Sequence, residues 1–439
     1  MKRTLFLVLV VVVMIFTACA APTTAPTKAP DQTAATPAQT SSEKVKLTFS
    51  AWGAPEELAV WKEIVNDFQE KYPNITVNVE VGDWDAYWDK IKTQLAANTA
   101  PDIFAMDAPL YLDYQTRGVL LNLQPFVDAN PDMMKDIYPQ TLEAYKTADG
   151  YYGLPRDFNT IVLFYNKDMF DQAKVTYPTV DWTWDDLRAA AKKLTLDTNS
   201  DGKIEQYGYT FDQWDMEPGW SEALWSYGGE IVNAERTKTL IGEPKAREAW
   251  QMLYDMVFQD KSCPDANQVA ELGGDPFTAG RAAMNAMGHW AVPGYVGAGF
   301  QFDAAPMPKG PAGHATSVNS AGFVVAKTTK YPKESFEFIK YVLSPDAQGK
   351  LAKLGFAVPV LKSVAESDTF LKQEGSTLNQ QVFLDSLEFA HMKPVFRGYD
   401  EWAAAVGDGL APVWNGEAEL NATLDEVVKA ADAVLAKVK

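Results

Sequence analysis

Residues 197–205 carry oxygen atoms at a spacing that could coordinate a cation. The run reads Asp197-Thr198-Asn199-Ser200-Asp201-Gly202-Lys203-Ile204-Glu205. Side-chain oxygens at its first, third and fifth positions, glycine at the sixth, a backbone carbonyl at the seventh and glutamate at the ninth match the start of a calcium-binding loop. The twelfth position, where such a loop has a bidentate glutamate, is Gly208. We therefore predict an Asx-rich turn. Calcium coordination is the alternative, by Asp197, Asn199, Asp201, Lys203 and Glu205, and we expect no other cofactor.

The residues of metal-dependent and covalent catalysis are sparse. His289, His314 and His391 are the only three histidines, and their scatter through the chain argues against a zinc site. A Gly-x-Ser-x-Gly nucleophile motif does not occur in the sequence. Cys19 and Cys263 are the only two cysteines, so no internal disulfide forms if Cys19 is acylated. We expect a protein that is not an enzyme.

Tryptophan is abundant, and its side chains could form a stacking site for sugar rings. All thirteen tryptophans lie beyond residue 43. Trp61 and Trp250 fall inside amphipathic helical patterns, which predicts that they are buried in the core. Others lie at strand ends or beside glycine and proline, where loops form and ligands bind. These are Trp52, Trp84, Trp220, Trp225 and Trp290.

Strand and helix patterns alternate from residue 45 onward. Polar and apolar residues predict strands at 45–49, 75–81 and 101–106, and helices at 56–71 and 85–97. This order predicts an α/β fold with a parallel sheet covered by helices. Ligands bind beyond the carboxyl ends of such strands. Trp52 and Asp107 fall at those ends.

The N-terminal segment has the features of an export signal. Lys2 and Arg3 precede an apolar run at 5–16, which is shorter than the ~20 residues that span a bilayer. Cys19 follows small residues and resembles the lipobox cysteine of bacterial lipoproteins, with Phe16 where that pattern has leucine. We predict a signal peptide at 1–18, and lipidated Cys19 followed by an Ala/Pro/Thr-rich tether at 19–43. The alternative is an ordinary cleavable signal with an incidental cysteine.

Charge and length limit the partners and the architecture. The formal net charge of −19 argues against nucleic acid and anionic lipid headgroups as partners. We therefore expect contact with the membrane through the anchor only. The 439 residues are enough for two domains after the leader and tether are removed.

Several motifs follow one another along the chain in a recognisable order. The longest is 151–170, YYGLPRDFNTIVLFYNKDMF. The others are Pro101-Asp102-Ile103, Gly118-Val119-Leu120, AMNAMGHW at 283–290, Gly322-Phe323-Val324-Val325 and YPKESFEFIKYVLSP at 331–345. In this order they resemble extracellular sugar-binding proteins of ABC importers, the solute-binding protein family 1, of which the maltose-binding protein is the best-known type. The resemblance covers nearly all of the chain after Lys44.

The resemblance implies a two-lobed α/β fold of the periplasmic-binding-protein type II that closes on its ligand like a clamshell. In this family the chain crosses between lobes more than once. We place the crossings near 157–160, 312–320 and 356–359. Lobe one would hold 44–157 and 318–358, and lobe two 158–317 and 359–439.

The same resemblance implies a set of ligand-binding residues. Lobe one would contribute Trp52, Glu56 and Asp107, and the hinge Asn159. Lobe two would contribute stacking aromatics and one cation. The full set is Trp52, Glu56, Trp84, Asp107, Asn159, Trp220, Trp225, Trp290, Arg397, Tyr399 and Trp402.

The implied function is capture of a carbohydrate, expected to be an oligosaccharide, for delivery to the permease of an ABC importer. We expect an extracytoplasmic, lipid-anchored monomer. One alternative is a cell-surface glycoside hydrolase, because abundant Asp, Glu and Trp suit paired-carboxylate chemistry. A second is a binding protein for a non-sugar solute such as a glycerol-phosphate ester or a peptide.

Overall fold

The computed structural model describes residues 44–373 and 376–438. The predicted signal peptide, the lipidation site Cys19 and the tether lie outside these residues. Among the helices of the described residues, none combines the length and the apolar character that a membrane crossing requires.

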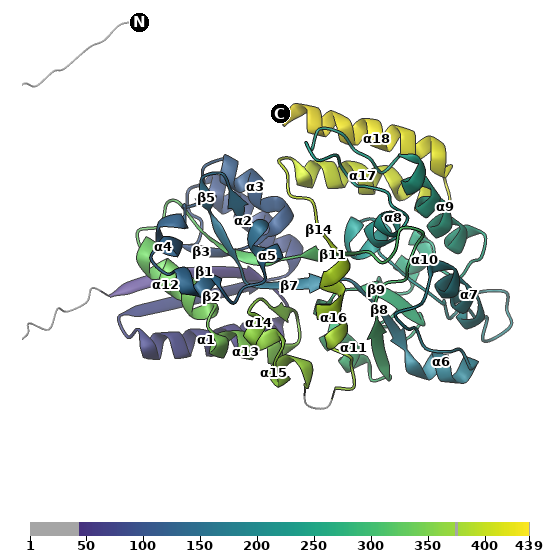
Figure 1. The fold of residues 1–439 in the computed structure, drawn as a ribbon, viewed down its shortest axis with the longest axis horizontal. Coiled ribbons are helices and arrows are strands. Elements are labelled where there is room, and N and C mark those ends of the chain that lie inside the picture. The colour runs from purple at the N-terminus through teal and green to yellow at the C-terminus, as the bar shows by residue number, and fades with distance from the viewer. Residues whose placement is uncertain (1–43, 374–375, 439) are drawn as a thin grey trace, which may run out of the picture. The chain divides into compact units, whose positions relative to one another are not determined.

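The first sheet has five strands in the order β2-β1-β3-β12-β6. β1 pairs in parallel with β2 and β3, as the alternating pattern predicted, whereas β12 is antiparallel to β3 and β6. We call this sheet and the helices packed around it lobe one (Figure 1). Its strands are β1 (Val45–Trp52), β2 (Ile75–Gly82), β3 (Ile103–Asp107), β6 (Gly153–Pro155) and β12 (Ala321–Val325), and its longer helices are α1 (Pro55–Lys71), α2 (Trp84–Ala96), α3 (Ala108–Thr116), α12 (Pro332–Val342) and α13 (Pro345–Leu354).

Helix α1 forms where the predicted helix lies and fixes the carboxyl end of β1. Pro55 occupies its first turn, where a missing N–H costs nothing. Glu57 in the same turn accepts the Ala54 N–H at 2.9 Å. Trp61, Ile64 and Phe68 follow at helical spacing and are fully buried against the sheet.

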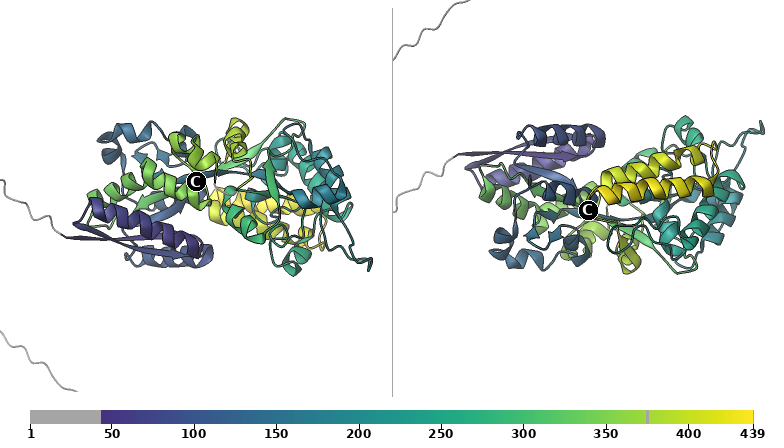
Figure 2. Two further views of the ribbon diagram at one scale, coloured as in Figure 1. Left: turned by 90° about the horizontal axis from the view of Figure 1, so that it is seen from below. Right: turned by 90° about the horizontal axis from the view of Figure 1, so that it is seen from above.

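The second sheet has three strands in the order β10-β8-β9, all antiparallel. We call this sheet and its helices lobe two. Its strands are β8 (Val162–Asn166), β9 (Met284–Met287) and β10 (Phe302–Ala305), and its helices are α6 (Lys167–Ala173), α7 (Trp184–Leu194), α8 (Ser221–Ser226), α9 (Pro244–Phe258), α10 (Ala266–Glu271), α11 (Val292–Ala298), α17 (Tyr399–Trp414) and α18 (Leu420–Lys437). Figure 2 shows α17 and α18 side by side at the C-terminal end. Between α7 and α8, Tyr207 and Thr210 form isolated bridges with Ala282 and Asn285.

A third sheet joins the two lobes. It has the order β13-β7-β11-β14, with β7 at Asp157–Thr160, β11 at Thr316–Asn319, β13 at Val358–Pro359 and β14 at Ala390–Met392. Figure 1 shows β7 running between the sheets of lobe one and lobe two. The three segments predicted as crossings contain β7, β11 and β13, and these strands pair with one another through β7. β14 is a fourth strand of this sheet that the sequence did not indicate.

The segment after β13 does not follow the predicted boundary, which assigned 359–439 to lobe two. Helices α14 (Lys362–Ala365) and α15 (Asp368–Leu371) contact α13 of lobe one. The backbone N–H of Lys362 donates to Asp136 O at 2.8 Å, and Tyr138 N–H donates to Val360 O at 3.2 Å. These bonds satisfy the backbone of the segment within lobe one, so the chain passes to lobe two only after α15.

The lobes also meet at the N-terminus of α17. The Gly398 N–H lies 3.0 Å from both carboxylate oxygens of Asp113 on α3. Lys92 on α2 forms an ion pair with Asp400 at 3.1 Å. A carboxylate at a helix N-terminus interacts favourably with the helix dipole. This contact therefore adds to the connecting sheet in holding the lobes together.

The remaining elements are short connections. They are α4 (Gln124–Asp128), α5 (Pro139–Glu143), the hairpin of β4 (Lys146–Thr147) and β5 (Gly150–Tyr151), α16 (Gln381–Asp385), and single-turn segments at Pro131–Met134, Met216–Trp220, His289–Ala291 and Ser386–Phe389.

Candidate functional site

A cavity of about 570 Å³ lies where lobe one, lobe two and the connecting sheet meet. A volume of this size is typical of small-molecule sites. Lobe one and the connecting sheet supply most of its wall, and lobe two supplies Asp215, Glu217 and Trp290. The lining residues are Trp52, Gly53, Ala54, Glu57, Asp83, Trp84, Asp107, Arg156, Asp157, Asn159, Asp215, Glu217, Trp290, Asn319, Ala321, Phe356, Ala357 and Lys393.

Five of the predicted ligand-binding residues lie on this wall: Trp52, Trp84, Asp107, Asn159 and Trp290. They come from the ends of β1 and β3, the start of α2, strand β7 and the turn after β9. Five of the predicted positions therefore lie together in one cavity, and they come from both lobes and from the connecting sheet.

Trp52 and Trp84 form the aromatic side of lobe one. Their ring centroids are 5.0 Å apart in an edge-to-face arrangement, which is the favoured geometry for aromatic pairs. Trp52 also stacks against the Arg156 guanidinium, 5.6 Å from its ring. Trp84 remains 46% exposed, so part of its ring is free for a ligand.

Trp290 provides an aromatic surface from the other side of the cavity. A Cβ on Gly288 would lie 1.9 Å from the Trp290 ring, so the ring can lie against this residue only because it is glycine. Asn159 Oδ1 accepts the His289 N–H at 3.0 Å and ties this turn to β7. The two nitrogens of the buried His289 ring lie 2.7 Å from Gly355 O and 2.6 Å from the Gln380 side-chain amide, and a neutral ring donates from one of them and accepts at the other. These contacts fix the position of Trp290.

Burial keeps the His289 side chain uncharged. It lowers the pKa of His289 to about 4, although both ring nitrogens have hydrogen-bond partners. His289 is thus a neutral structural connector rather than a titrating group at neutral pH.

Arg156 and Asp157 form a buried ion pair at the floor of the cavity. Arg156 Nε donates to Asp157 Oδ2 at 2.5 Å. Burial raises the pKa of Asp157, and the Arg156 charge opposes that effect. Arg156 Nη1 has no hydrogen-bond partner among the described residues. One donor of this guanidinium is therefore available to a ligand.

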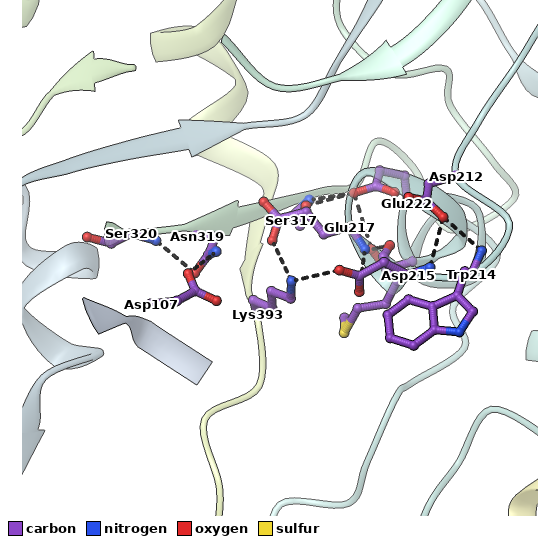
Figure 3. A network of polar contacts seen from close by, with 12 residues as sticks. Asp107, Asp212, Trp214, Asp215, Glu217, Glu222, Ser317, Asn319, Ser320 and Lys393 are labelled. Carbon is purple, nitrogen blue, oxygen red and sulfur yellow. Dashed lines mark hydrogen bonds and ion pairs between the residues drawn. The ribbon is translucent and has the colours of Figure 1, made fainter. Parts of the chain in front are cut away.

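Lys393 lies at the centre of a polar network that joins the lobes (Figure 3). Its ammonium is 3.5 Å from Asp215 Oδ2 and 3.4 Å from Glu217 Oε2. On the lobe one side, Asp107 Oδ1 accepts from Asn319 Nδ2 at 2.8 Å. Figure 3 shows Asp107 and Asn319 on one side of Lys393, with Asp215 and Glu217 on the other.

Burial and neighbouring charges shift the pKa values of the groups in this network. Burial lowers the pKa of Lys393, but Asp215, Tyr399, Glu217 and Asp107 raise it by more, so that it lies well above its usual value. Burial raises the pKa of Glu217 to about 8, and the Lys393 charge only partly opposes this. Burial also raises the pKa of Asp107. Buried groups with shifted pKa values in a cavity are typical of functional sites.

Six predicted residues do not line the cavity. Trp220 is 1% exposed and packs against Trp250, with ring centroids 4.9 Å apart. Trp225 stacks on His391 at 4.8 Å. These two predictions are wrong. Elements α9 and β14 cover the two rings, and no pattern in the sequence indicated that they would lie beside Trp220 and Trp225.

The late aromatics and the first-turn glutamate also lie elsewhere. Trp402 is buried and donates to Thr239 Oγ1 at 2.9 Å. Tyr399 is buried beside Lys393, 5.8 Å from its ammonium, but does not line the cavity. Arg397 is exposed, and Glu56 points outward while Glu57 lines the cavity.

The residues that the sequence missed are mainly charged. Glu57 follows one position after the predicted Glu56, and Asp83 directly precedes Trp84 as the cap of α2. Glu217 stands beside the predicted Trp220 in the run Glu217-Pro218-Gly219-Trp220. Each of these three charged residues lies within three positions of a residue that was predicted to bind the ligand, so the sequence could have indicated them.

The predicted Asx-rich turn at 197–205 has hydrogen bonds that need no ion. Asp197 Oδ2 accepts Gly202 N–H and Asp201 Oδ1 accepts Lys203 N–H, each at 2.8 Å. Glu205 Oε2 accepts Thr198 N–H at 2.7 Å. Carboxylate oxygens of Asp197, Asp201 and Glu205 lie within 4.8 Å of one another. Calcium coordination by this run stays the alternative to the predicted turn.

Comparison with known proteins identifies the family. A profile of bacterial extracellular solute-binding proteins matches residues 63–375. The chain belongs to this family. A putative binding protein of Brucella abortus is 25% identical over 407 residues, covering 90% of this chain and 94% of that protein. The maltodextrin-binding protein of Bacillus subtilis is 24% identical over 319 residues, covering 70% of each.

A solved structure confirms the fold class. The ABC substrate-binding protein of Listeria monocytogenes in complex with cycloalternan is 27% identical and superposes with a TM-score of 0.82, covering 90% of this chain and all of that one. The predicted family and the two-lobed α/β fold are thus confirmed. The named relatives are binding proteins rather than enzymes.

Proposed function

We propose that this solute-binding protein captures a carbohydrate, expected to be an oligosaccharide, and delivers it to the permease of an ABC importer. The observation that carries the proposal is the cavity between the lobes, with Trp84 on one side, Trp290 on the other and carboxylates between them. Tryptophan faces pack on sugar rings, and carboxylates accept hydroxyl hydrogen bonds strongly. The relatives named for maltodextrin and cycloalternan support this solute class.

The arrangement also supports a binding mechanism without chemistry on the solute. A solute that touches both lobes favours the closed state, because it gains contacts there that the open state lacks. The connecting sheet supplies the strands about which the lobes rotate. We infer that the permease recognises the closed form.

The cavity gives little support to a phosphate ester as solute. Such a ligand requires free cations or exposed helix N-termini. Arg156 pairs with Asp157, and Lys393 lies between Asp215 and Glu217. The two cations of the wall are thereby largely neutralised by the protein itself.

We further propose that the protein is exported and held at the membrane by lipid on Cys19, as a monomer on the Ala/Pro/Thr-rich tether. The support is the sequence pattern at 1–43 and the extracellular character of the family. One relative, from Streptomyces antibioticus, is named an uncharacterized lipoprotein. Confinement near the transporter raises the effective concentration of the protein there.

Tryptophan fluorescence tests the proposed function, because three tryptophans line the cavity. We expect a saturable emission change with at least one neutral sugar among glucose, galactose, mannose, maltotriose and cellotriose. Chromatography of the same mixtures should detect no new product. Trp290→Ala should weaken binding at least about fivefold, whereas Trp182→Phe, outside the cavity, should not. Hydrolysis of any sugar, or no response to any saccharide, would overturn the proposal.

A further inference from the structure

Carboxylates outnumber cations on the wall of the cavity. The acidic lining residues are Glu57, Asp83, Asp107, Asp157, Asp215 and Glu217, and the basic ones are Arg156 and Lys393. A buried charge is costly unless a partner neutralises it. The question is therefore which of these carboxylates the protein leaves without a partner.

Three of the six carboxylates are neutralised or capped locally. Asp157 pairs with Arg156 at 2.5 Å. Glu57 accepts the Ala54 N–H at the start of α1, and Asp83 accepts a backbone N–H at 3.0 Å at the start of α2. Helix N-termini stabilise such carboxylates. These three need nothing from a ligand.

The other three carboxylates share a single cation, although Asp107 also accepts from Asn319 Nδ2 at 2.8 Å and Asp215 accepts the Glu217 N–H at 3.5 Å. Asp215 and Glu217 both lie near the Lys393 ammonium, at 3.5 and 3.4 Å, and Asp107 contributes a further negative charge to it. One lysine cannot neutralise three carboxylates. The protein thus leaves excess negative charge at this end of the cavity.

Glu217 is the carboxylate with the fewest partners. Its side chain is 4% exposed, and neither of its oxygens has a hydrogen-bond partner among the described residues, although Lys393 lies nearby. It lines the cavity, and both of its oxygens are buried there. A ligand donor would satisfy oxygens that the protein leaves free.

The titration of Glu217 is consistent with a missing cation. The charged and titratable groups that face it are Lys393, Asp107, Glu222, Asp215 and Tyr399. Burial and the neighbouring acids raise its pKa to about 8 against the effect of Lys393. The empty site therefore holds a proton near neutral pH, and a ligand cation would replace that proton.

We propose that the preferred solute is a basic sugar, whose protonated amine lies against Glu217. This inference rests on the proposed carbohydrate function and specifies the chemical class of the solute. An amine donates up to three hydrogen bonds and supplies the positive charge that the acid-rich end of the cavity lacks. Uronic acids and sugar phosphates would add negative charge where it already exceeds positive charge.

Matched pairs of sugars test the charge of the solute while keeping its shape. The first three pairs differ only in an amine or a hydroxyl at one ring carbon: glucosamine and glucose, galactosamine and galactose, and mannosamine and mannose. The fourth pair, the β-1,4-linked glucosamine trimer and cellotriose, differs in the same way at C2 of each of its three rings. Calorimetric titration at pH 7 and low salt should show that, in the pair that binds best, the amino sugar binds at least about tenfold more tightly. The difference should shrink at high salt, because screening weakens attraction between charges.

Two variants locate this selectivity at Glu217. Glu217→Gln keeps the shape and removes the charge, so it should abolish the preference for the amino sugar while retaining binding of the neutral one, which also shows that it is folded. Glu248→Gln removes one charge from the exposed face of α9 and should keep the preference. Neutral sugars that bind as tightly as their amino partners, or a preference that survives in Glu217→Gln, would overturn this inference and leave the proposed function standing. Binding of no sugar would overturn both.

Discussion

Replacing Glu217 by glutamine should stabilise the unliganded protein, and it should do so only above the pH at which glutamate normally ionises. Glu217 is 4% exposed and neither oxygen has a hydrogen bond to a described residue, so beyond the Lys393 ammonium at 3.4 Å its ionised form is poorly solvated in the folded state. Burial raises its pKa from 4.5 to about 8. Between these two values the folded state keeps a proton that the unfolded state has released, so stability falls as the pH rises through this interval.

The magnitude follows from the two pKa values. The linkage relation gives a destabilisation of about 3 kcal/mol at pH 7 and nearly none at pH 4, with little further change above pH 8. Glutamine carries no charge at any pH and avoids this cost, while Lys393 keeps Asp215 as a partner. The variant should therefore match the parent protein near pH 4 and exceed it by up to about 3 kcal/mol at pH 7.

Urea unfolding at a series of pH values measures the effect. Glu248→Gln, which removes an exposed charge from α9, serves as the control and should change stability by no more than about 0.5 kcal/mol at each pH. The reasoning is refuted if Glu217→Gln is less stable than the parent at pH 7, or if its effect is the same at pH 4 and pH 7. Either result would mean that the Glu217 carboxylate is adequately solvated or paired in the folded state.

Three further predictions concern Trp290, the anchor and the acidic turn. Gly288→Ala would place a Cβ 1.9 Å from the Trp290 ring, so the ring must move and sugar affinity measured by calorimetry should fall at least about fivefold; unchanged affinity would show that the ring position is not required. Cys19→Ala should release the protein from the membrane fraction into the soluble fraction with sugar affinity intact, and retention at the membrane would contradict the anchor. Calcium should leave the melting temperature unchanged, because the turn satisfies its own hydrogen bonds; a rise that Asp201→Ala abolishes would instead establish a calcium site.

Local patterns in the sequence predicted the elements of lobe one well, because each strand and helix carries its own periodicity. The direction in which a side chain points was harder to predict from the sequence. The sequence shows two adjacent glutamates after β1, and the choice of Glu56 was wrong because the helix phase turns Glu57 toward the cavity. Pro55 in the first helical turn could have set that phase, since proline favours this position.

Long-range packing explains the remaining errors. Trp220 lies beside glycine and proline, which favoured a loop at a ligand site, yet Trp250 on α9 buries it. The sequence did not indicate Lys393 as a cavity residue, because it follows β14, a strand of only three residues in which no periodicity can be recognised. The contacts that place both residues join segments far apart in the chain, and a sequence pattern within one segment does not encode them.

The position of Lys393 connects the charge network to lobe movement. Lys393 directly follows β14 in the connecting sheet, whereas Asp107 ends β3 of lobe one and Glu217 belongs to lobe two. Rotation of the lobes about this sheet moves the two carboxylates relative to each other more than it moves Lys393. Because burial raises the pKa of Glu217 to about 8, Asp107 and Glu217 repel each other as two charged groups only above about that pH when the site is empty. A solute that supplies hydrogen-bond donors or positive charge between the carboxylates contacts both lobes, so we expect occupancy of the cavity to favour the closed state.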